Sequence, residues 1–127
     1  MRLLLDTHVF VWYDSGDSRL NDDTRFAVDD PANEIYLSVA SIWEIVAKHR
    51  LGQFKLPGSP AEHLMAVRDQ FGFVNLFIDD GSVLELAKLP LIRRDPFDRI
   101  IIAQANQHGL KLVTEDPMMR QYQADFL

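Results

Sequence analysis

Short runs of apolar residues alternate along the chain with longer stretches in which apolar residues recur every three or four positions. The short runs, at residues 2–5, 35–37, 73–78 and 111–114, are typical of buried strands. The longer stretches predict helices at residues 7–13, 21–29, 38–51, 59–71, 79–89 and 95–108. Capping residues support these boundaries, since Ser38 and Ser59 precede helices and Gly52 and Gly109 follow them.

The order of these elements predicts the fold class. Strands that alternate with helices form a mainly parallel sheet with helices on both faces. We therefore expect a three-layer α/β/α sandwich in a single domain at residues 1–127, because no linker or repeat divides the chain. A short helix beginning at Asp116-Pro117 and an edge strand at residues 124–127 complete the prediction.

Composition and charge narrow the function classes. Apolar residues make up 47% of the chain, enough for one core, and the absence of cysteine excludes disulfide scaffolds, thiolate metal sites and cysteine nucleophiles. No apolar run approaches the length of a membrane span, so we expect a cytoplasmic protein with no membrane partner. A net charge of −6 argues against binding nucleic acid by bulk electrostatics, unless the carboxylates hold cations.

Two aspartates follow predicted strands. Asp6 ends the first strand, and Asp116 comes just after the strand at residues 111–114. Because ligands bind beyond the carboxyl ends of parallel strands, both side chains are expected to face one crevice. The alternative is that each caps a helix. Capping suits Asp116, which precedes a proline, better than Asp6, which lies between two apolar runs.

Glu44 is the only charged residue in the largely apolar stretch from Val39 to Ala47. A helix that is apolar all round is a buried helix, so its glutamate is expected to reach a polar pocket or a cation. The alternative is a buried ion pair, with Lys48 four positions later or with an arginine elsewhere. We favour a functional role, because carboxylates are rarely buried without one.

Asp98 lies in the first turn of the helix at residues 95–108, where the free backbone amides favour acidic side chains. It shares a helix face with Ile101 and Ala105, which places its carboxylate at the top of the buried stripe. Asp95, which directly precedes a proline, is the better capping residue. We therefore expect Asp98 to face the same crevice as the other selected acids.

Carboxylates that converge on one crevice cannot all stay charged unaided. The candidates are Asp6, Glu44, Asp98 and Asp116. Mg²⁺ and Mn²⁺ prefer carboxylate oxygens and resolve this conflict. The usual chemistry of such a site is in-line hydrolysis of a phosphodiester by metal-activated water.

Four motifs occur in a fixed order along the chain. They are LLDTH at residues 4–8, SIWEI at 41–45, RDPFDRIIIAQA at 94–105 and LVTED at 112–116. These motifs resemble those of PIN-domain ribonucleases, and most closely those of the VapC toxins of bacterial type II toxin–antitoxin pairs. The resemblance covers the whole chain and implies a compact α/β/α domain that binds Mg²⁺ or Mn²⁺ and cleaves RNA.

The same resemblance assigns roles to individual residues. It places the family's acids on the four carboxylates selected by burial, Asp6, Glu44, Asp98 and Asp116, and it gives Thr114 a role in supporting the fourth. The fourth acid is the least constant in the family, which leaves open whether Asp116 binds the metal directly.

Other residues near the motifs have two interpretations each. Thr7 either hydrogen-bonds a carboxylate or a water in the site, which is the role we favour, or caps the helix. His8 either contacts a phosphate or is structural. Three arginines flank Asp98 and would bind the RNA backbone, or else pair with Asp95. They are Arg93, Arg94 and Arg99.

The resemblance also implies partners: an RNA substrate, a VapB-like antitoxin and a second copy of the chain. The helices at residues 38–51 and 59–71 carry more apolar surface than one small sheet face needs. Candidate dimer contacts, which would serve equally well to cover the sheet, are Leu64, Met65, Val67 and Phe71.

Two other functions fit parts of the sequence. An inactive PIN-like scaffold would only bind a partner, although the four intact acids argue against it. A receiver-like signalling domain would share the length, the acid-rich strand ends and Lys111. However, residues 51–70 contain no strand that ends in an acceptor aspartate.

Overall fold

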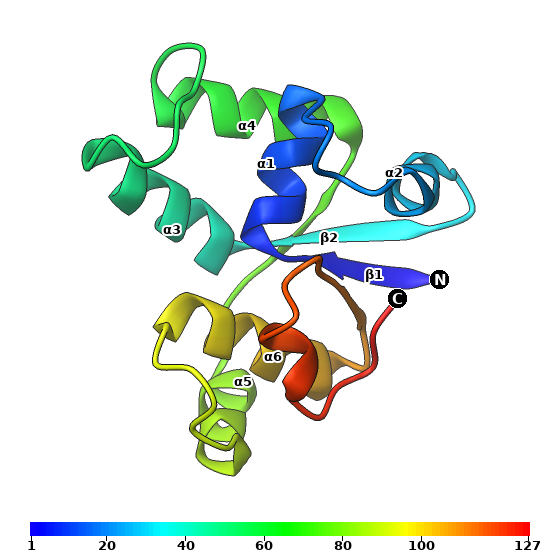
Figure 1. Ribbon diagram of the computed structural model, residues 1–127, viewed down its shortest axis with the longest axis vertical. Coiled ribbons are helices and arrows are strands. Elements are labelled where there is room, and N and C mark those ends of the chain that lie inside the picture. Colours follow the sequence, from blue (N-terminus) through cyan, green and yellow to red (C-terminus); the bar gives the residue numbers. More distant parts are fainter.

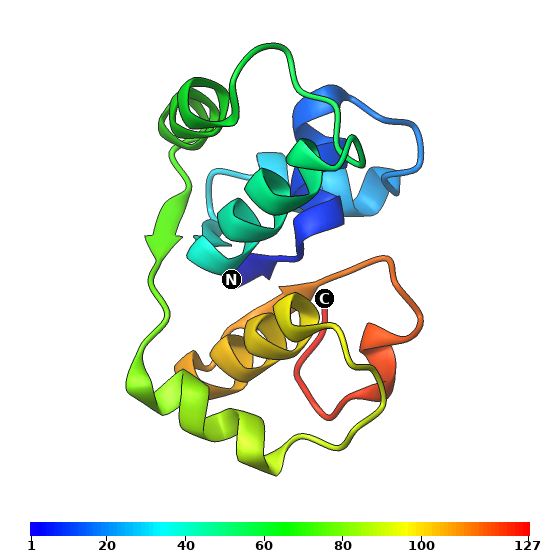
Figure 2. The same cartoon turned by 90° about the vertical axis from the view of Figure 1, so that its left-hand side faces the viewer.

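The computed structural model describes residues 1–127 and has three layers (Figures 1 and 2). The central sheet is wholly parallel, with the strand order β3-β2-β1-β4. Its strands are β1 (Arg2–Leu5), β2 (Glu34–Ser38), β3 (Val74–Leu76) and β4 (Lys111–Val113). The predicted α/β/α sandwich with a parallel sheet is confirmed.

Helices cover both faces of the sheet (Figure 2). One layer contains α1 (Thr7–Ser15), α2 (Asp22–Asp29), α3 (Val39–Arg50) and α4 (Pro60–Phe71). The other contains α5 (Asp80–Glu85), the 3₁₀ turn η1 (Leu86–Lys88), α6 (Pro96–His108) and the 3₁₀ turn η2 (Met119–Gln121). Residues 51–70 form a loop and most of α4, so the strand that a receiver domain needs there is absent.

Side chains of each strand alternate between two apolar clusters, as the two-residue period of a strand requires. In β1, Leu3 and Leu5 pack in the cluster beneath α1, α3 and α4, while Leu4 points into the cluster on the α6 side. All three leucines are fully buried. The sheet therefore separates two cores, and Asp6 is the first polar residue after three buried leucines.

Capping residues fix where the helices begin. Asp6 accepts a hydrogen bond from the backbone N–H of Val9 at 2.7 Å, and Ser38 accepts one from Ala40. Asp6 directly follows β1 and Ser38 is the last residue of β2, so α1 and α3 both start at the carboxyl edge of the sheet. Asp95 caps α6 by accepting the N–H of Phe97 at 2.9 Å, as its position before a proline predicts.

The prediction that α3 is buried all round is wrong. Glu44 is 1% exposed, but Trp43 is 57% exposed and Val46 is 45% exposed. The helix packs against α1, α4, α6 and β2, while Trp43 and Val46 form an apolar outer strip that stays exposed. The outer strip includes the edge-to-face contact of Trp43 with Phe97 on α6, whose ring centroids lie 4.8 Å apart.

The carboxyl-terminal predictions hold only in part. The expected edge strand at residues 124–127 is reduced to one parallel bridge between Leu112 and Phe126. The helix expected after Asp116 is the single 3₁₀ turn η2, and the helix expected to reach Leu89 gives way to η1 after Glu85. Residues 124–127 are joined to β4 by only two backbone hydrogen bonds, which link Leu112 with Asp125 and Leu127, so a single bridge forms in place of a strand. No helix combines the length and apolar character needed to cross a membrane.

Candidate active site

The carboxyl ends of β1 and β4 bring the first acidic residues together. The two strands are neighbours in the sheet, and the backbone N–H of Asp6 donates to the carbonyl of Val113 at 3.0 Å. Thr114, the next residue, donates its hydroxyl to Oδ2 of Asp6 and accepts the backbone N–H of Asp116 at 3.1 Å. One threonine therefore contacts both aspartates, whereas the sequence resemblance gave it a role beside Asp116 alone.

The carboxylate of Asp6 is almost completely buried, with 4% of the residue exposed. Burial raises the pKa of Asp6 from 3.8 to about 7, and the nearby charges of Asp98 and Asp116 add to this shift. The hydrogen bonds from Thr114 and from the backbone of Val9 act in the opposite direction. An ionised Asp6 therefore lacks sufficient positive charge around it in the metal-free protein.

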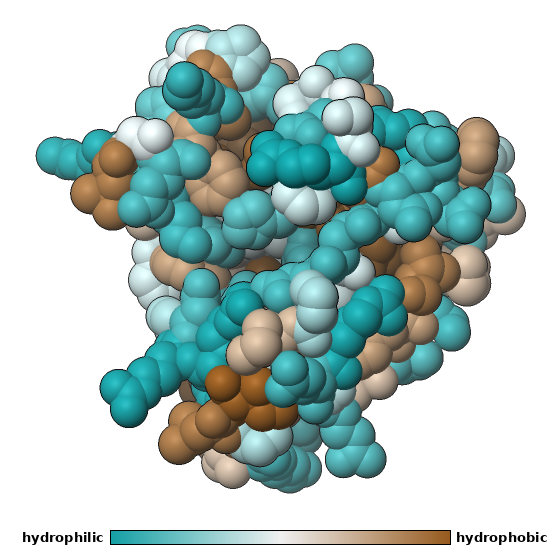
Figure 3. All heavy atoms as spheres, viewed as in Figure 1, coloured by the Kyte–Doolittle hydropathy of each residue, from teal (hydrophilic) through white to brown (hydrophobic).

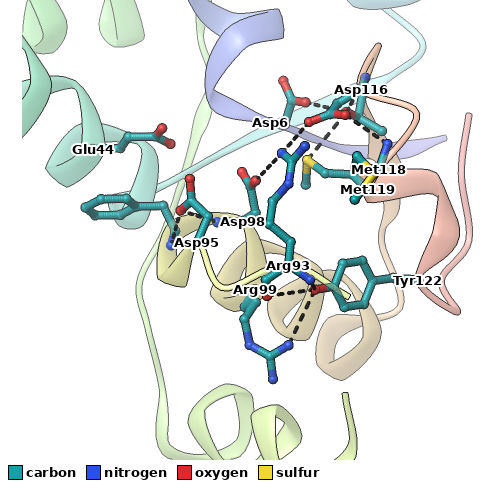
Figure 4. A network of polar contacts seen from close by, with 12 residues as sticks. Asp6, Glu44, Arg93, Asp95, Asp98, Arg99, Asp116, Met118, Met119 and Tyr122 are labelled. Carbon is teal, nitrogen blue, oxygen red and sulfur yellow. Dashed lines mark hydrogen bonds and ion pairs between the residues drawn. The ribbon is translucent and has the colours of Figure 1, made fainter. Parts of the chain in front are cut away.

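Arg93 joins the other two aspartates of this edge (Figure 4). Its Nη1 lies 2.9 Å from Oδ2 of Asp98 on α6 and 2.5 Å from Oδ2 of Asp116 after β4. The pKa of Asp98 is nevertheless raised, because burial and the charges of Asp95 and Glu44 outweigh the hydrogen bond from Arg93. The pKa values of Asp6 and Asp98 are thus both raised, because burial disfavours their ionised forms and Arg93 alone does not balance the negative charge of the acids around it.

Glu44 lies on the side of α3 that faces α6, apart from the three aspartates (Figure 4). Its Oε2 accepts from Nζ of Lys48, so the ion pair considered from the sequence is present. Its Oε1, however, is buried and has no hydrogen-bond partner. A buried carboxylate oxygen without a partner is costly, which points to a ligand that the carboxylate meets in the working protein. Lys48 therefore satisfies one oxygen of the Glu44 carboxylate and leaves the other free for a ligand.

The four carboxylates are arranged loosely. No three acidic or histidine side chains lie close enough together, as they stand, to hold a metal ion. Their chemistry still fits one. Asp6 has a raised pKa, one oxygen of Glu44 lacks a partner, and a guanidinium occupies the space between Asp98 and Asp116. An oxygen-rich set of this kind suits Mg²⁺ or Mn²⁺.

A pocket of about 280 Å³ opens beside the aspartates. It is lined by Asp6, His8, Trp12, Glu115, Asp116 and Pro117. The space-filling view shows a hollow on this largely hydrophilic face, between the side chains over α1 and those over α6 (Figure 3). His8 is exposed at its wall, with its ring 5.9 Å from that of Trp12 and 5.5 Å from that of Phe54. The imidazole is therefore held by aromatic contacts and remains accessible to a ligand.

The remaining predicted residues differ in what they touch. Thr7 donates to Oγ of Ser41 at 3.0 Å and joins α1 to α3, without a hydrogen bond to a carboxylate. Arg99 donates to the carbonyl of Pro90 at 2.8 Å, away from the acids. Arg94 is exposed and its side chain forms no hydrogen bond or ion pair. Of the three arginines, only Arg93 forms ion pairs with the candidate acids, and none of the three pairs with Asp95, the alternative considered from the sequence.

Sequence reasoning missed Tyr122. Its hydroxyl accepts the backbone N–H of Arg93 at 2.9 Å and donates to the carbonyl of the same residue at 3.2 Å. Tyr122 is buried, and 29 residues separate it from Arg93, so no local pattern could reveal the contact. Gln104, which bonds Ser38 at 2.5 Å, was also missed, although it lies within the motif at residues 94–105.

Together, the wholly parallel sheet and the buried carboxylates at its carboxyl edge define an α/β protein with an acidic site. A family model described as PIN domain matches residues 3–125. The chain belongs to the PIN domain family.

Known proteins similar to this chain include Ribonuclease VapC22 of Mycobacterium tuberculosis. It is 28% identical over 127 residues, which cover 94% of this chain and 91% of the relative.

Two solved structures share the fold. VapBC2 from Rickettsia felis, bound to a DNA fragment from its promoter, matches with a TM-score of 0.72 at 13% identity, over 100% of this chain and 97% of that one. VapBC-5 from Mycobacterium tuberculosis, a member of the VapBC family of toxin–antitoxin systems, matches with a TM-score of 0.61 at 19% identity, over 94% of this chain and 89% of that one.

Proposed function

We propose that residues 1–127 form one PIN domain that acts as a metal-dependent endoribonuclease, the toxin of a type II toxin–antitoxin pair. The single observation that supports this most strongly is the buried group of acids at the carboxyl edge of the sheet. Asp6, whose pKa is raised, has no cationic partner in the chain, and Oε1 of Glu44 is buried without a partner although Oε2 pairs with Lys48, so both carboxylates are open to a bound cation. The similarity to a ribonuclease of the VapC type agrees with it.

Asp6 and Asp98 are the principal ligands for Mg²⁺ in this proposal, and Mn²⁺ is able to substitute. Glu44 and Asp116 complete the pocket or hold its water molecules. A bound ion would supply positive charge that lowers the pKa of a water molecule and offsets the charge developing on the phosphate. Hydrolysis by in-line attack of water on phosphorus leaves a 5′-phosphate and a 3′-hydroxyl.

The chain's own residues orient these groups. Thr114 and the backbone of Val9 hold the Asp6 carboxylate in one orientation, and Asp95 fixes the first turn of α6 beneath Asp98. His8 at the pocket wall and Arg93 beside the acids are the groups best placed to contact an RNA phosphate. Arg94, which is exposed and unpaired, provides a further positive charge for the RNA backbone.

A VapB-like antitoxin restrains the enzyme in this proposal. An arginine or lysine from a flexible antitoxin segment would lie among the acids in place of a metal ion, because guanidinium–carboxylate bonds are strong and can be bidentate. The fold similarity to two VapBC proteins supports a partner of this kind.

Cleavage of RNA by the purified chain tests the activity. We expect cleavage with Mg²⁺ or Mn²⁺, no cleavage in EDTA, and loss of cleavage in Asp6→Asn and in Asp98→Asn variants that remain folded. Cleavage that persists in EDTA, or a fully active Asp98→Asn variant, would contradict the assignment. A folded wild-type chain that binds no Mn²⁺ and cuts no RNA would instead be the inactive scaffold.

A further inference from the structure

Arg93 is the one cation of the chain that touches two of the proposed metal ligands. A single nitrogen, Nη1, contacts both Asp98 and Asp116, which come from different elements, α6 and the segment after β4 (Figure 4). The contact joins these two segments at the mouth of the site. It places a positive charge where the two carboxylates would otherwise repel each other.

The main chain of Arg93 is held independently of its side chain. The hydroxyl of buried Tyr122 bonds both the N–H and the carbonyl of Arg93, at 2.9 and 3.2 Å. The loop between η1 and α6 is therefore anchored even if the guanidinium leaves the carboxylates. The side chain itself is 32% exposed, so it can move into solvent without opening the fold.

The guanidinium of Arg93 is also incompletely used. An arginine has five N–H donors, but only Nη1 of Arg93 forms hydrogen bonds. Arg99 differs from Arg93. Its Nη1 and Nη2 donate to the backbone carbonyls of Leu86, Leu89 and Pro90, and these bonds hold the segment before α6 in place. Arg93 therefore has the contacts of a displaceable counter-cation, whereas Arg99 has those of a structural brace.

We propose that the Arg93 side chain is an exchangeable counter-cation, which neutralises Asp98 and Asp116 in the metal-free protein and leaves them when a divalent ion binds. This inference rests on the proposed function, because it assumes that these carboxylates take part in metal binding. A divalent ion carries twice the charge of the guanidinium and is compact, so the carboxylates gain by the exchange. The displaced guanidinium then stands at the mouth of the site without an acidic partner.

The exchange lowers the affinity of the wild-type site for metal. A site that is available only when Arg93 has moved away binds metal with an affinity reduced by the fraction of molecules in that state. Removing the guanidinium should therefore tighten metal binding and, at the same time, weaken the metal-free fold. A purely structural ion pair would weaken the fold without competing with the metal.

Calorimetric titration of Mn²⁺ into the full chain tests the exchange. Arg93→Gln should bind Mn²⁺ about tenfold more tightly than the wild type. Arg94→Gln removes the same charge from the neighbouring residue, which touches no acid, and should stay within about twofold of the wild type. Equal tightening in the two variants, or weaker binding by Arg93→Gln, would overturn the exchange.

Nuclear magnetic resonance of the wild-type chain provides a measurement that does not depend on a variant folding. The side-chain nitrogen resonances of Arg93 should shift as Mg²⁺ is added and should lose the hindered rotation of a paired guanidinium. Resonances that do not change at saturating Mg²⁺ would overturn the exchange.

The Asp98→Asn variant separates the two proposals. If it binds Mn²⁺ as the wild type does, or if no protein binds Mn²⁺, the metal assignment fails and the exchange fails with it. If Asp98→Asn loses binding while Arg93→Gln matches the wild type, the metal site stands and only the exchange is wrong.

Discussion

The hydroxyl of Thr114 donates a hydrogen bond to the buried carboxylate of Asp6, although 108 residues separate the two in sequence. The bond exists because β1 and β4 are adjacent and parallel, so that both residues leave the sheet at the same edge. It also explains why Asp6 can sit in an apolar surrounding at all. Thr114 stabilises the ionised form of Asp6, which is the form that the proposed metal binding would use.

Replacing Thr114 with valine should raise the pKa of Asp6 above its present value of about 7, because the bond from Thr114 lowers it. We expect the pH profile of cleavage to move to higher pH, and stability to fall by about 1–3 kcal/mol, since buried partners lose a hydrogen bond. Thr114→Ser keeps the hydroxyl and should restore the wild-type profile. A profile that does not move in Thr114→Val would argue that Asp6 does not limit the reaction.

The metal-free protein should lose stability as the pH rises. Asp6 has a pKa of about 7 in the folded protein against 3.8 as its ordinary value, so the folded state binds more protons between these values. Stability therefore falls from about pH 4 to about pH 7 and is lowest above this range, with a contribution on the order of 2–4 kcal/mol. Asp98, whose pKa is also raised, acts in the same direction.

Asp6→Asn should remove most of this pH dependence and should be more stable than the wild type in EDTA at about pH 8. Urea unfolding of both proteins at about pH 5 and about pH 8 measures the difference. A wild-type protein that becomes more stable over this range would contradict the environment described for Asp6. Saturating Mg²⁺ should reverse the order and favour the wild type.

Lys48 neutralises Glu44, which is buried to 1% exposure. Lys48→Met should destabilise the protein by roughly 3–5 kcal/mol, because it leaves a buried carboxylate without its charged partner. The double variant Glu44→Gln with Lys48→Met should recover much of this loss. Denaturant unfolding of the two single variants and the double variant gives the coupling energy. Additive effects would show that the pair contributes little.

We expect the chain to form a homodimer. The candidate contacts Leu64 and Val67 are buried within the chain, so they cover the sheet. The exposed apolar residues of α3, Trp43 and Val46, are the better candidates. Light scattering should give about twice the 14.6 kDa mass of one chain.

A matched pair of variants locates the dimer contact. Trp43→Lys should yield monomers. Phe26→Lys, at a residue of α2 that is 71% exposed, should leave the dimer intact. A wild-type mass near 14.6 kDa would exclude the dimer.

Inhibition by the antitoxin should compete with metal. If a cation of the antitoxin lies among the acids, its apparent affinity falls as Mg²⁺ or Mn²⁺ is added, and replacing that cation with a neutral residue weakens inhibition. Affinity measured across a metal titration tests this. An affinity that does not change with metal would show that the antitoxin blocks access for RNA without entering the acidic site.

The sequence by itself determined the strands and main helices, since apolar periodicity and caps such as Ser38, Ser59 and Asp95 act over a few residues. It also selected Asp6 and Glu44 as buried acids, because a single charged residue within an apolar run is buried together with its apolar neighbours. Both are buried in the structure. Thr114 was found through its place in a motif.

Only the tertiary structure decided which groups meet. Arg93 pairs with Asp98 and Asp116 because α6 and the segment after β4 converge, and Tyr122 anchors its main chain from 29 residues away. The outward strip of α3 around Trp43 likewise follows from which neighbours pack on that helix. Local patterns specify how a segment folds and which residues avoid water. Partners distant in sequence depend on strand order and helix packing, which no single segment encodes.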